Sequence, residues 1–160
     1  MIFHLRTSEP GDFETLYEID KVCYAPAIAY SRRDLRSYLR LPGAECVVAE
    51  TSTGIVGFCI TAREAAEGHI ITLDVIEVCR RHGAGSLLLA EAERRLAAGG
   101  VRKVSLETAT DNRAAIAFWQ KHGYRPLSVL KRYYPNGLDA WAMSKTIGMS
   151  SKPVQKSGAL

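Results

Sequence analysis

The stretch LDVIEVCRRHGAGSLLL, residues Leu73 to Leu89, joins an apolar segment, a basic turn with two glycines and the start of a helical pattern. Its first residues continue the segment His69–Val78, whose Ile, Thr, Leu and Val content is typical of a buried strand. From Ala84 apolar residues recur at helical spacing, and Gly99-Gly100 ends the pattern. The stretch therefore predicts a strand, a turn and a helix in direct succession.

The turn from Arg80 to Ser86 has the features of an anion site. The first N–H groups of a helix have no partner within the helix, and the macrodipole adds partial positive charge, so anions bind there. Gly83 and Gly85 allow close approach of the backbone, and Arg80, Arg81 and His82 add positive charge. We predict that a diphosphate group binds this turn.

The residues missing from the turn narrow the choice of ligand. A Walker loop needs a lysine after its last glycine, and the dinucleotide fingerprint needs a third glycine where this chain has Leu88. Neither ATP nor NAD is therefore favoured. Taken alone, the stretch also fits a strand-to-helix turn that uses its glycines only for geometry.

Length and composition indicate one globular domain. The chain has 160 residues, of which 47% are hydrophobic and 24% charged, and a net charge of +4. That mild charge suits an anionic ligand, and without a long basic run we expect no direct nucleic-acid partner. The four cysteines form no C-x-x-C pair, so neither a metal site nor disulfides are expected. No signal-like or membrane-spanning run of about 18 apolar residues occurs, and we expect a cytoplasmic protein without a membrane partner.

Strand and helix patterns alternate along the rest of the chain, which predicts a mixed α/β sheet covered by helices. Strands are predicted over residues 2–6, 44–49, 55–62, 101–107, 124–131 and 140–146, with a polar loop at 63–68. Helices are predicted after caps at Asp12, at Ser31 and at Thr110 or Asp111, ending near residues 23, 41 and 123. We expect one domain over residues 1–147 and a disordered tail over 148–160.

Three segments carry a resemblance to a known family. Arg80-x-x-Gly83-x-Gly85 resembles the R/Q-x-x-G-x-G/A motif of the GCN5-related N-acetyltransferases (GNAT). The segments IAFWQKHGY (116–124) and KRYYPNGLDA (131–140) are similar to those of its branch that acetylates ribosomal proteins and protein N-termini. The resemblance spans Arg6 to Thr146. It implies a central, mostly antiparallel sheet with about four helices, whose central and following strands splay apart around the pantetheine arm of acetyl-CoA.

The resemblance also implies which residues bind acetyl-CoA. The central strand would contact the pantetheine and acetyl group, the turn would hold the diphosphate, and an asparagine that opens the next helix would reach the pantetheine arm. That asparagine could otherwise act only as a helix cap. These residues are Leu73, Asp74, Val75, Arg80, Arg81, His82, Gly83, Ala84, Gly85, Ser86 and Asn112.

The resemblance places the reaction at Glu107, Trp119 and Tyr134. Glu107 matches a proton acceptor of the family and would act as a general base through water, although a lone glutamate at a strand end is often only solvated. Trp119 stands where the family usually has a tyrosine that protonates the departing thiolate, and an indole cannot act as that acid. Either the thiolate leaves with only hydrogen-bond help, or another hydroxyl donates the proton, for which Tyr133 and Tyr134 are the candidates and Tyr134 is the one assigned here. Packing is the competing role for the tyrosines expected to line the acceptor site, which are Tyr24, Tyr30, Tyr133 and Tyr134.

These expectations favour transfer of an acetyl group from acetyl-CoA to a protein N-terminal α-amine, with ribosomal proteins among the candidate acceptors. An α-amine has an ordinary pKa of about 8, against about 10.4 for lysine, and is more readily neutral at neutral pH. Two alternatives stay open: acetylation of a small-molecule amine or antibiotic, and a non-catalytic acyl-CoA-binding domain. A peptide or protein is the expected partner, and the chain is expected to be a monomer or a homodimer.

Overall fold

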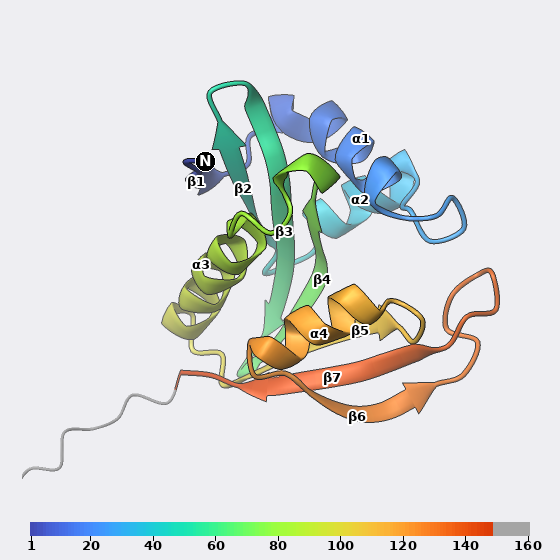
Figure 1. Ribbon diagram of the computed structural model, residues 1–160. Helices are drawn as coiled ribbons and strands as arrows, with labels where there is room; N and C mark the ends of the chain where they lie inside the picture. The colour runs from blue at the N-terminus through green and yellow to red at the C-terminus, as the bar shows by residue number, and fades with distance from the viewer. Residues whose placement is uncertain (149–160) are drawn as a thin grey trace, which may run out of the picture.

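The computed structural model describes residues 1–148, over which seven strands form one sheet in the order β1-β2-β3-β4-β5-β7-β6 (Figure 1). Neighbouring strands are antiparallel except β4 and β5, which are parallel. This arrangement confirms the predicted mixed sheet with four helices. The elements are β1 (His4–Thr7), α1 (Phe13–Cys23), α2 (Arg32–Leu39), β2 (Glu45–Thr51), β3 (Gly54–Glu64), β4 (Glu67–Val75), α3 (Ala84–Ala98), β5 (Lys103–Ala109), α4 (Arg113–Lys121), β6 (Arg125–Leu130) and β7 (Ala140–Thr146).

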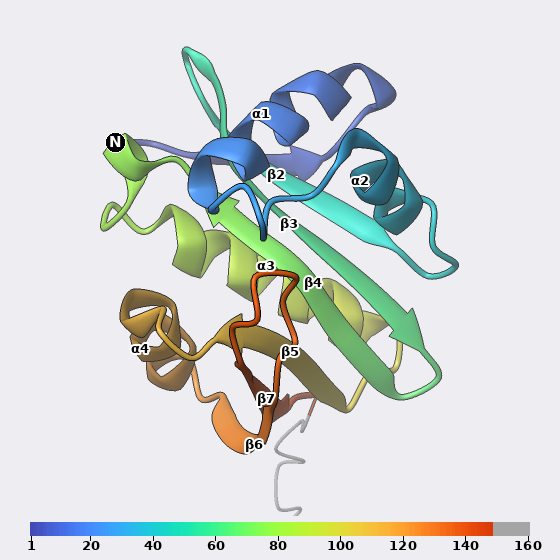
Figure 2. The ribbon, with the colours of Figure 1, turned by 90° about the vertical axis from the view of Figure 1, so that its right-hand side faces the viewer.

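Helices cover both faces of the sheet (Figures 1 and 2). One hydrophobic cluster joins α1 and α2 to one face, and a larger cluster joins α3 and α4 to the other. The alternation of side chains along β2 supplies both clusters, since Cys46 and Val48 belong to the first, and Val47 and Ala49 to the second. The central strands β2 and β3 are therefore buried on both sides, whereas the edge strand β6 is mostly exposed.

The parallel strands β4 and β5 pair over only part of their length. Three residue pairs join them, ending at His69 and Ser105, whereas β5 pairs with β7 along all seven of its residues. Beyond His69 the two strands diverge, as Figure 1 shows. The expected opening between the central strand and the next one is confirmed.

Two predicted boundaries of the central strands are wrong. The predicted polar loop over residues 63–68 belongs to a β3–β4 hairpin, in which Arg63 pairs with Gly68 and Glu64 pairs with Glu67. Polar residues suffice there because an exposed hairpin end is held by backbone hydrogen bonds. The strand predicted to reach Val78 ends at Val75, because residues 77–79 form a 3₁₀ turn. In this turn the Cys79 N–H donates to the Ile76 carbonyl, and the Arg80 N–H donates to the Glu77 carbonyl.

The helix caps were predicted with mixed success. Ser31 caps α2, and its hydroxyl accepts a hydrogen bond from the Asp34 N–H at 3.1 Å. The cap of α4 is Asn112 rather than Thr110 or Asp111, and its Oδ1 accepts from the Ala115 N–H at 3.1 Å. Asp12 precedes α1 as predicted, but its side chain makes no hydrogen bond to that helix.

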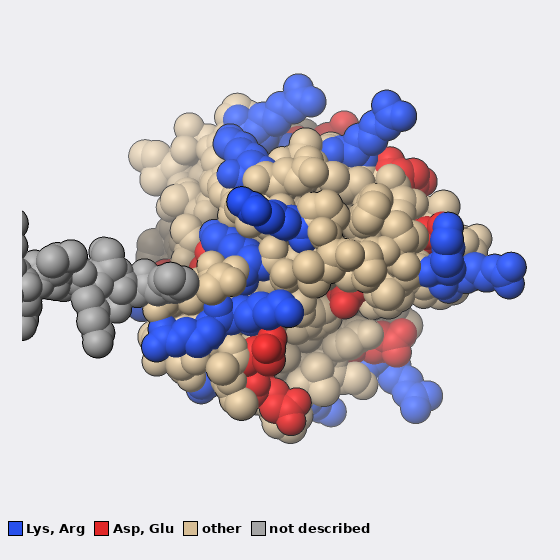
Figure 3. All heavy atoms as spheres, turned by 90° about the horizontal axis from the view of Figure 1, so that it is seen from below, with Lys and Arg blue, Asp and Glu red and all other residues tan. Residues whose placement is uncertain are grey.

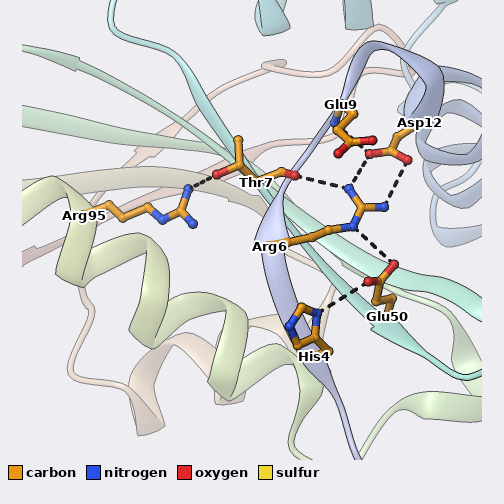
Figure 4. A network of polar contacts seen from close by, with 7 residues as sticks. All are labelled: His4, Arg6, Thr7, Glu9, Asp12, Glu50 and Arg95. Carbon is orange, nitrogen blue, oxygen red and sulfur yellow. Dashed lines mark hydrogen bonds and ion pairs between the residues drawn. The ribbon is translucent and has the colours of Figure 1, made fainter.

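Asp12 instead joins a polar network at the edge of the sheet (Figure 4). Its carboxylate accepts two hydrogen bonds from the Arg6 guanidinium, at 2.8 and 3.2 Å, and one from the Glu9 N–H at 2.7 Å. Arg6 Nε also lies 3.3 Å from Glu50 Oε2 on β2. The hydrogen bonds from Arg6 lower the pKa of Asp12. The network thus joins β1 to β2 and to the start of α1.

On the face seen in Figure 3, Lys and Arg side chains are prominent and acidic side chains lie between them. No helix within residues 1–148 has the length and apolar character needed to cross a membrane. The predicted disordered tail falls, apart from Gly148, outside the described residues, so it stays a prediction together with the domain boundary at 147.

Candidate active site

The turn before α3 presents an uncapped helix N-terminus beside exposed basic residues. Gly83, the residue before the helix, has a φ of 90°, and a Cβ built there would meet nothing within 4 Å. No side chain among residues 1–148 caps α3, and residues 80–83 are exposed. The first N–H groups of α3 therefore have no side-chain partner there, and a helix N-terminus of this kind stabilises an anion.

Gly85 serves a different purpose from Gly83. A Cβ at Gly85 would lie 3.3 Å from the Phe118 ring, so this glycine allows α3 to approach α4 closely. One residue further on, Ser86 Oγ lies 2.9 Å from Nε2 of His122, whose ring stacks against Phe118 with centroids 4.6 Å apart. Burial lowers the pKa of His122. Sequence reasoning missed this link, because nothing local to Ser86 or His122 indicates that two helices meet there.

The side chain of Arg80 turns back toward the central strand. Its Nε donates a hydrogen bond to the Val75 carbonyl at 2.8 Å, and the Cys23 thiol points at the same oxygen from 3.5 Å. Arg80 therefore fastens the turn to the end of β4. The exposed side chains of Arg81 and His82 supply the remaining positive charge of the turn.

The edge of β4 that faces the opening holds Leu73, Asp74 and Val75. Within residues 1–148, β4 has no partner strand on this side beyond His69. Asp74 as a whole is 1% exposed, and its side chain accepts a hydrogen bond from Thr72 Oγ1 at 2.5 Å, so this carboxyl group is not available to a ligand in the opening. Asn112 uses Oδ1 as a helix cap, which leaves its amide nitrogen as a further donor.

Glu107 lies against a histidine that sequence analysis did not single out. Glu107 Oε2 is 2.6 Å from His69 Nε2, and the two side chains are 23% and 41% exposed. The register of β4 and β5 explains the contact, because His69 pairs with Ser105, two residues before Glu107 on the same side of the strand. A histidine in an apolar strand was visible in the sequence, but its partner depends on that register.

Four tyrosines form a connected cluster, here called the tyrosine wall: Tyr30, Tyr38, Tyr133 and Tyr134. Tyr133 and Tyr134 are its members near Glu107. Tyr30 stacks on Tyr38 with centroids 4.8 Å apart, and Tyr133 packs edge-on against Tyr134 at 5.0 Å. Burial and the nearby Glu107 charge raise the pKa of Tyr133, and burial, with Tyr133 and Glu107, raises that of Tyr134 to about 12. Figure 2 shows the β6–β7 hairpin, which carries Tyr133 and Tyr134, reaching across β4 and β5 toward the α1–α2 loop.

Two other predicted residues lie in more buried surroundings. The Tyr24 hydroxyl is 3.4 Å from Thr72 Oγ1 on β4. Trp119 is 7% exposed and packs edge-on against Phe118 and Tyr124, at 5.0 and 5.4 Å. Trp119 is thus a core residue, and its role in a reaction stays a prediction.

Comparisons with known proteins agree with this geometry. A model described as the acetyltransferase (GNAT) family matches residues 13–124. An N-alpha-acetyltransferase of Saccharolobus solfataricus is 24% identical over 158 residues, covering 91% of this chain and 93% of that protein. An uncharacterized N-acetyltransferase of Methanocaldococcus jannaschii is 34% identical over 99 residues, 61% of this chain and 64% of that protein. The crystal structure of the ribosomal-protein-S18-alanine N-acetyltransferase of Escherichia coli superimposes with a TM-score of 0.83 at 24% identity, covering 96% of this chain and 99% of that one.

Proposed function

Because the chain belongs to the GNAT acetyltransferase family, we propose that it transfers an acetyl group to the α-amino group of a protein N-terminus. The chain is an N-acetyltransferase, and acetyl-CoA is its cosubstrate. The acceptor and the roles of individual residues are the proposed part. One observation carries them: Glu107 lies 2.6 Å from His69 where β4 and β5 diverge, and Tyr133 and Tyr134 of the tyrosine wall are near it.

The residues around the opening suit acetyl-CoA, which supplies an activated acetyl thioester. The exposed start of α3, with Arg81 and His82 beside it, would hold the diphosphate through the N–H groups of residues 83–86. The backbone of residues 73–75, which has a partner strand on the β3 side alone, would bind the pantetheine arm, and the Asn112 amide would add a donor. Arg80 would act indirectly, by fastening the turn to Val75.

Glu107 is placed to accept the proton of the acceptor amine. Attack on a thioester needs a neutral amine, and a carboxylate within reach of the amine or of a bridging water can remove its proton. His69 would hold Glu107 in position through their hydrogen bond and share the positive charge of the transferred proton. Tyr134, with its pKa raised to about 12, keeps its proton at neutral pH and is a candidate donor to the thiolate.

The acceptor side favours a peptide. Aromatic side chains offer broad, rigid contact area at little cost in conformational entropy, which suits a peptide segment. An α-amine, with an ordinary pKa of about 8, also loses its proton more readily than a lysine side chain does. The archaeal relative named an N-alpha-acetyltransferase and the Escherichia coli neighbour named for ribosomal protein S18 support testing ribosomal N-termini first.

The test combines acetyl-CoA with a panel of peptides that differ in their first residues, each synthesised with a free and with a blocked N-terminus. Mass spectrometry should find one added acetyl group on the free peptides and none on the blocked ones. Acetylation of an internal lysine or of small amines alone would overturn the proposal. Isothermal titration with acetyl-CoA, run on the same preparation, distinguishes an inactive CoA-binding domain from a protein that lacks the cosubstrate site.

A further inference from the structure

Two carboxyl groups meet in the interior between α1 and β4. Asp20 and Asp74 are each 1% exposed, and each carboxyl group affects the pKa of the other. In the described part of the chain, Asp20 Oδ1 and Asp74 Oδ2 are the two buried side-chain oxygens without a hydrogen-bond partner. Ionised carboxylates only accept hydrogen bonds, so a hydrogen bond between these oxygens requires a proton on one of them.

The other oxygen of each carboxyl group is already used. Asp20 Oδ2 accepts from the Tyr30 N–H at 2.7 Å, and Asp74 Oδ1 accepts from Thr72 Oγ1 at 2.5 Å. Burial raises the pKa of both groups, and the neighbouring Asp20 charge raises that of Asp74 further. A proton on Asp74 would remove the like-charge contact and supply a donor to the unpartnered Asp20 oxygen.

No cation neutralises the pair directly. Its titratable neighbours on α1, on the α1–α2 loop, on β2 and on β3 are thiols and phenols, and burial raises the pKa of each. The Arg80 guanidinium, which lies near Cys23, donates its hydrogen bond to the Val75 carbonyl. These neighbours are Cys23, Tyr24, Tyr30, Cys46 and Cys59.

The pair connects the central strand to the acceptor side. Asp20 holds the backbone of Tyr30, whose ring belongs to the tyrosine wall and whose hydroxyl donates to the Ile71 carbonyl at 3.3 Å. Asp74 holds Thr72, which contacts the Tyr24 hydroxyl. Asp74, through Thr72, thus supports Tyr24 at the start of the α1–α2 loop, and Asp20 supports Tyr30 near its end.

We propose that Asp20 and Asp74 share one proton and are positioning residues that hold the α1–α2 loop, and with it Tyr30, in place to bind the acceptor. The proposal rests on the proposed function only where it concerns the acceptor. Loss of the shared proton at alkaline pH places two like charges side by side in a buried site, which loosens the loop. The KM for the acceptor peptide then rises while kcat changes little.

The kinetic test compares the wild type with Asp20→Asn and Asp20→Ala. In Asp20→Asn, the amide oxygen can still accept a hydrogen bond from the Tyr30 N–H, and the amide nitrogen can donate one to Asp74. Position 20 can no longer carry a negative charge, so Asp74 has no like charge beside it at any pH. We expect Asp20→Asn to keep the neutral-pH acceptor KM and to lack the alkaline rise. Asp20→Ala should raise the acceptor KM about tenfold at neutral pH, because it leaves the Tyr30 N–H without a partner. Deprotonation of the acceptor amine affects all three proteins equally. The ratio of each variant's acceptor KM to that of the wild type at the same pH therefore reports the effect of the Asp20–Asp74 pair alone.

A spectroscopic test does not depend on activity. With isotope-labelled aspartate, the wild type at neutral pH should show the infrared carbonyl band of a protonated carboxylic acid. Asp20→Asn should lack the band, because the new amide donor lets Asp74 ionise. Absence of the band in the wild type, or an alkaline KM rise in Asp20→Asn equal to that of the wild type, would overturn the proposal. If no peptide is acetylated, the proposed function fails and the infrared result still decides whether the proton is shared.

Discussion

Glu107 owes its chemical role to its neighbours. A glutamate near the end of a strand is usually solvated, but here the side chain is partly covered and lies 2.6 Å from a histidine on the next strand. The same face carries tyrosines whose raised pKa values reflect burial and the Glu107 charge. A carboxylate held beside an imidazole, with neutral phenols around it, is suited to take up a proton from an amine.

The first prediction therefore concerns Glu107→Gln. The amide keeps the size of the side chain and a hydrogen bond to His69, but it cannot take up a proton, so kcat should fall about 100-fold at neutral pH. The deficit should shrink as the pH rises through the ordinary α-amine pKa of about 8, because free amine then needs no base. Steady-state kinetics across this range checks the prediction, with Glu67→Gln at the exposed start of β4 as the matched control. Wild-type rates at every pH would remove Glu107 from the mechanism.

At the scale of elements, the start of α3 is the feature that most directly predicts a ligand. Its helical residues Leu88, Ala92 and Leu96 are buried as the sequence pattern predicts, and no side chain in the described range caps its first N–H groups. Of the two glycines in the turn, Gly83 has the left-handed backbone and open surroundings, whereas Gly85 is required by the contact with Phe118. Gly83 is therefore the better probe of ligand binding.

The second prediction compares the two ends of this helix. Gly83 and Gly100 have φ values of 90° and 91°, and a Cβ at either would meet nothing within 4 Å. Substitution of either glycine by alanine should cost about 1–2 kcal/mol of stability, since an L-residue is strained in this conformation. Only Gly83→Ala should also weaken acetyl-CoA binding, about tenfold, as expected for the loss of one charge-assisted hydrogen bond. Calorimetric titration of both variants checks this, and equal affinities would contradict the placement of the diphosphate.

At the scale of the whole molecule, the buried acid pair makes the stability of the fold depend on pH. Burial raises the pKa of Asp74 well above its ordinary value of 3.8, so the folded state keeps a proton that the unfolded chain has released. The stabilising contribution of that proton is fully present below the unfolded pKa and is lost as the pH rises through the folded pKa. The slope is at most about 1.4 kcal/mol per pH unit for one proton.

The third prediction follows from that slope. Asp74→Asn keeps a donor toward Asp20 and removes the titrating proton, so the variant should gain stability relative to the wild type as the pH rises above about 4. Urea unfolding at a series of pH values measures the difference, with Asp34→Asn on exposed α2 as the matched control. Parallel stability curves for the wild type and Asp74→Asn would show that the folded protein does not retain this proton.

The sequence by itself determined the local parts of the molecule. The limits of α3, the strand at 140–146, the Ser31 cap and the glycine turn all follow from periodicity, capping and backbone preferences that act over a few residues. The resemblance of three short segments added the family, which the matching family model bears out. These features needed no knowledge of what packs against them.

The tertiary structure alone decided which distant side chains meet. His69 reaches Glu107 through the register of two parallel strands, Asp20 reaches Asp74 because α1 packs on β4, and Gly85 is required by a ring on α4. Register and packing are set by the summed burial of many side chains across the sheet, and no single segment carries that information. For this reason the pattern of residues 73–89 located the ligand turn, whereas the histidine partner of the proposed base and the buried acid pair emerged only from the folded chain.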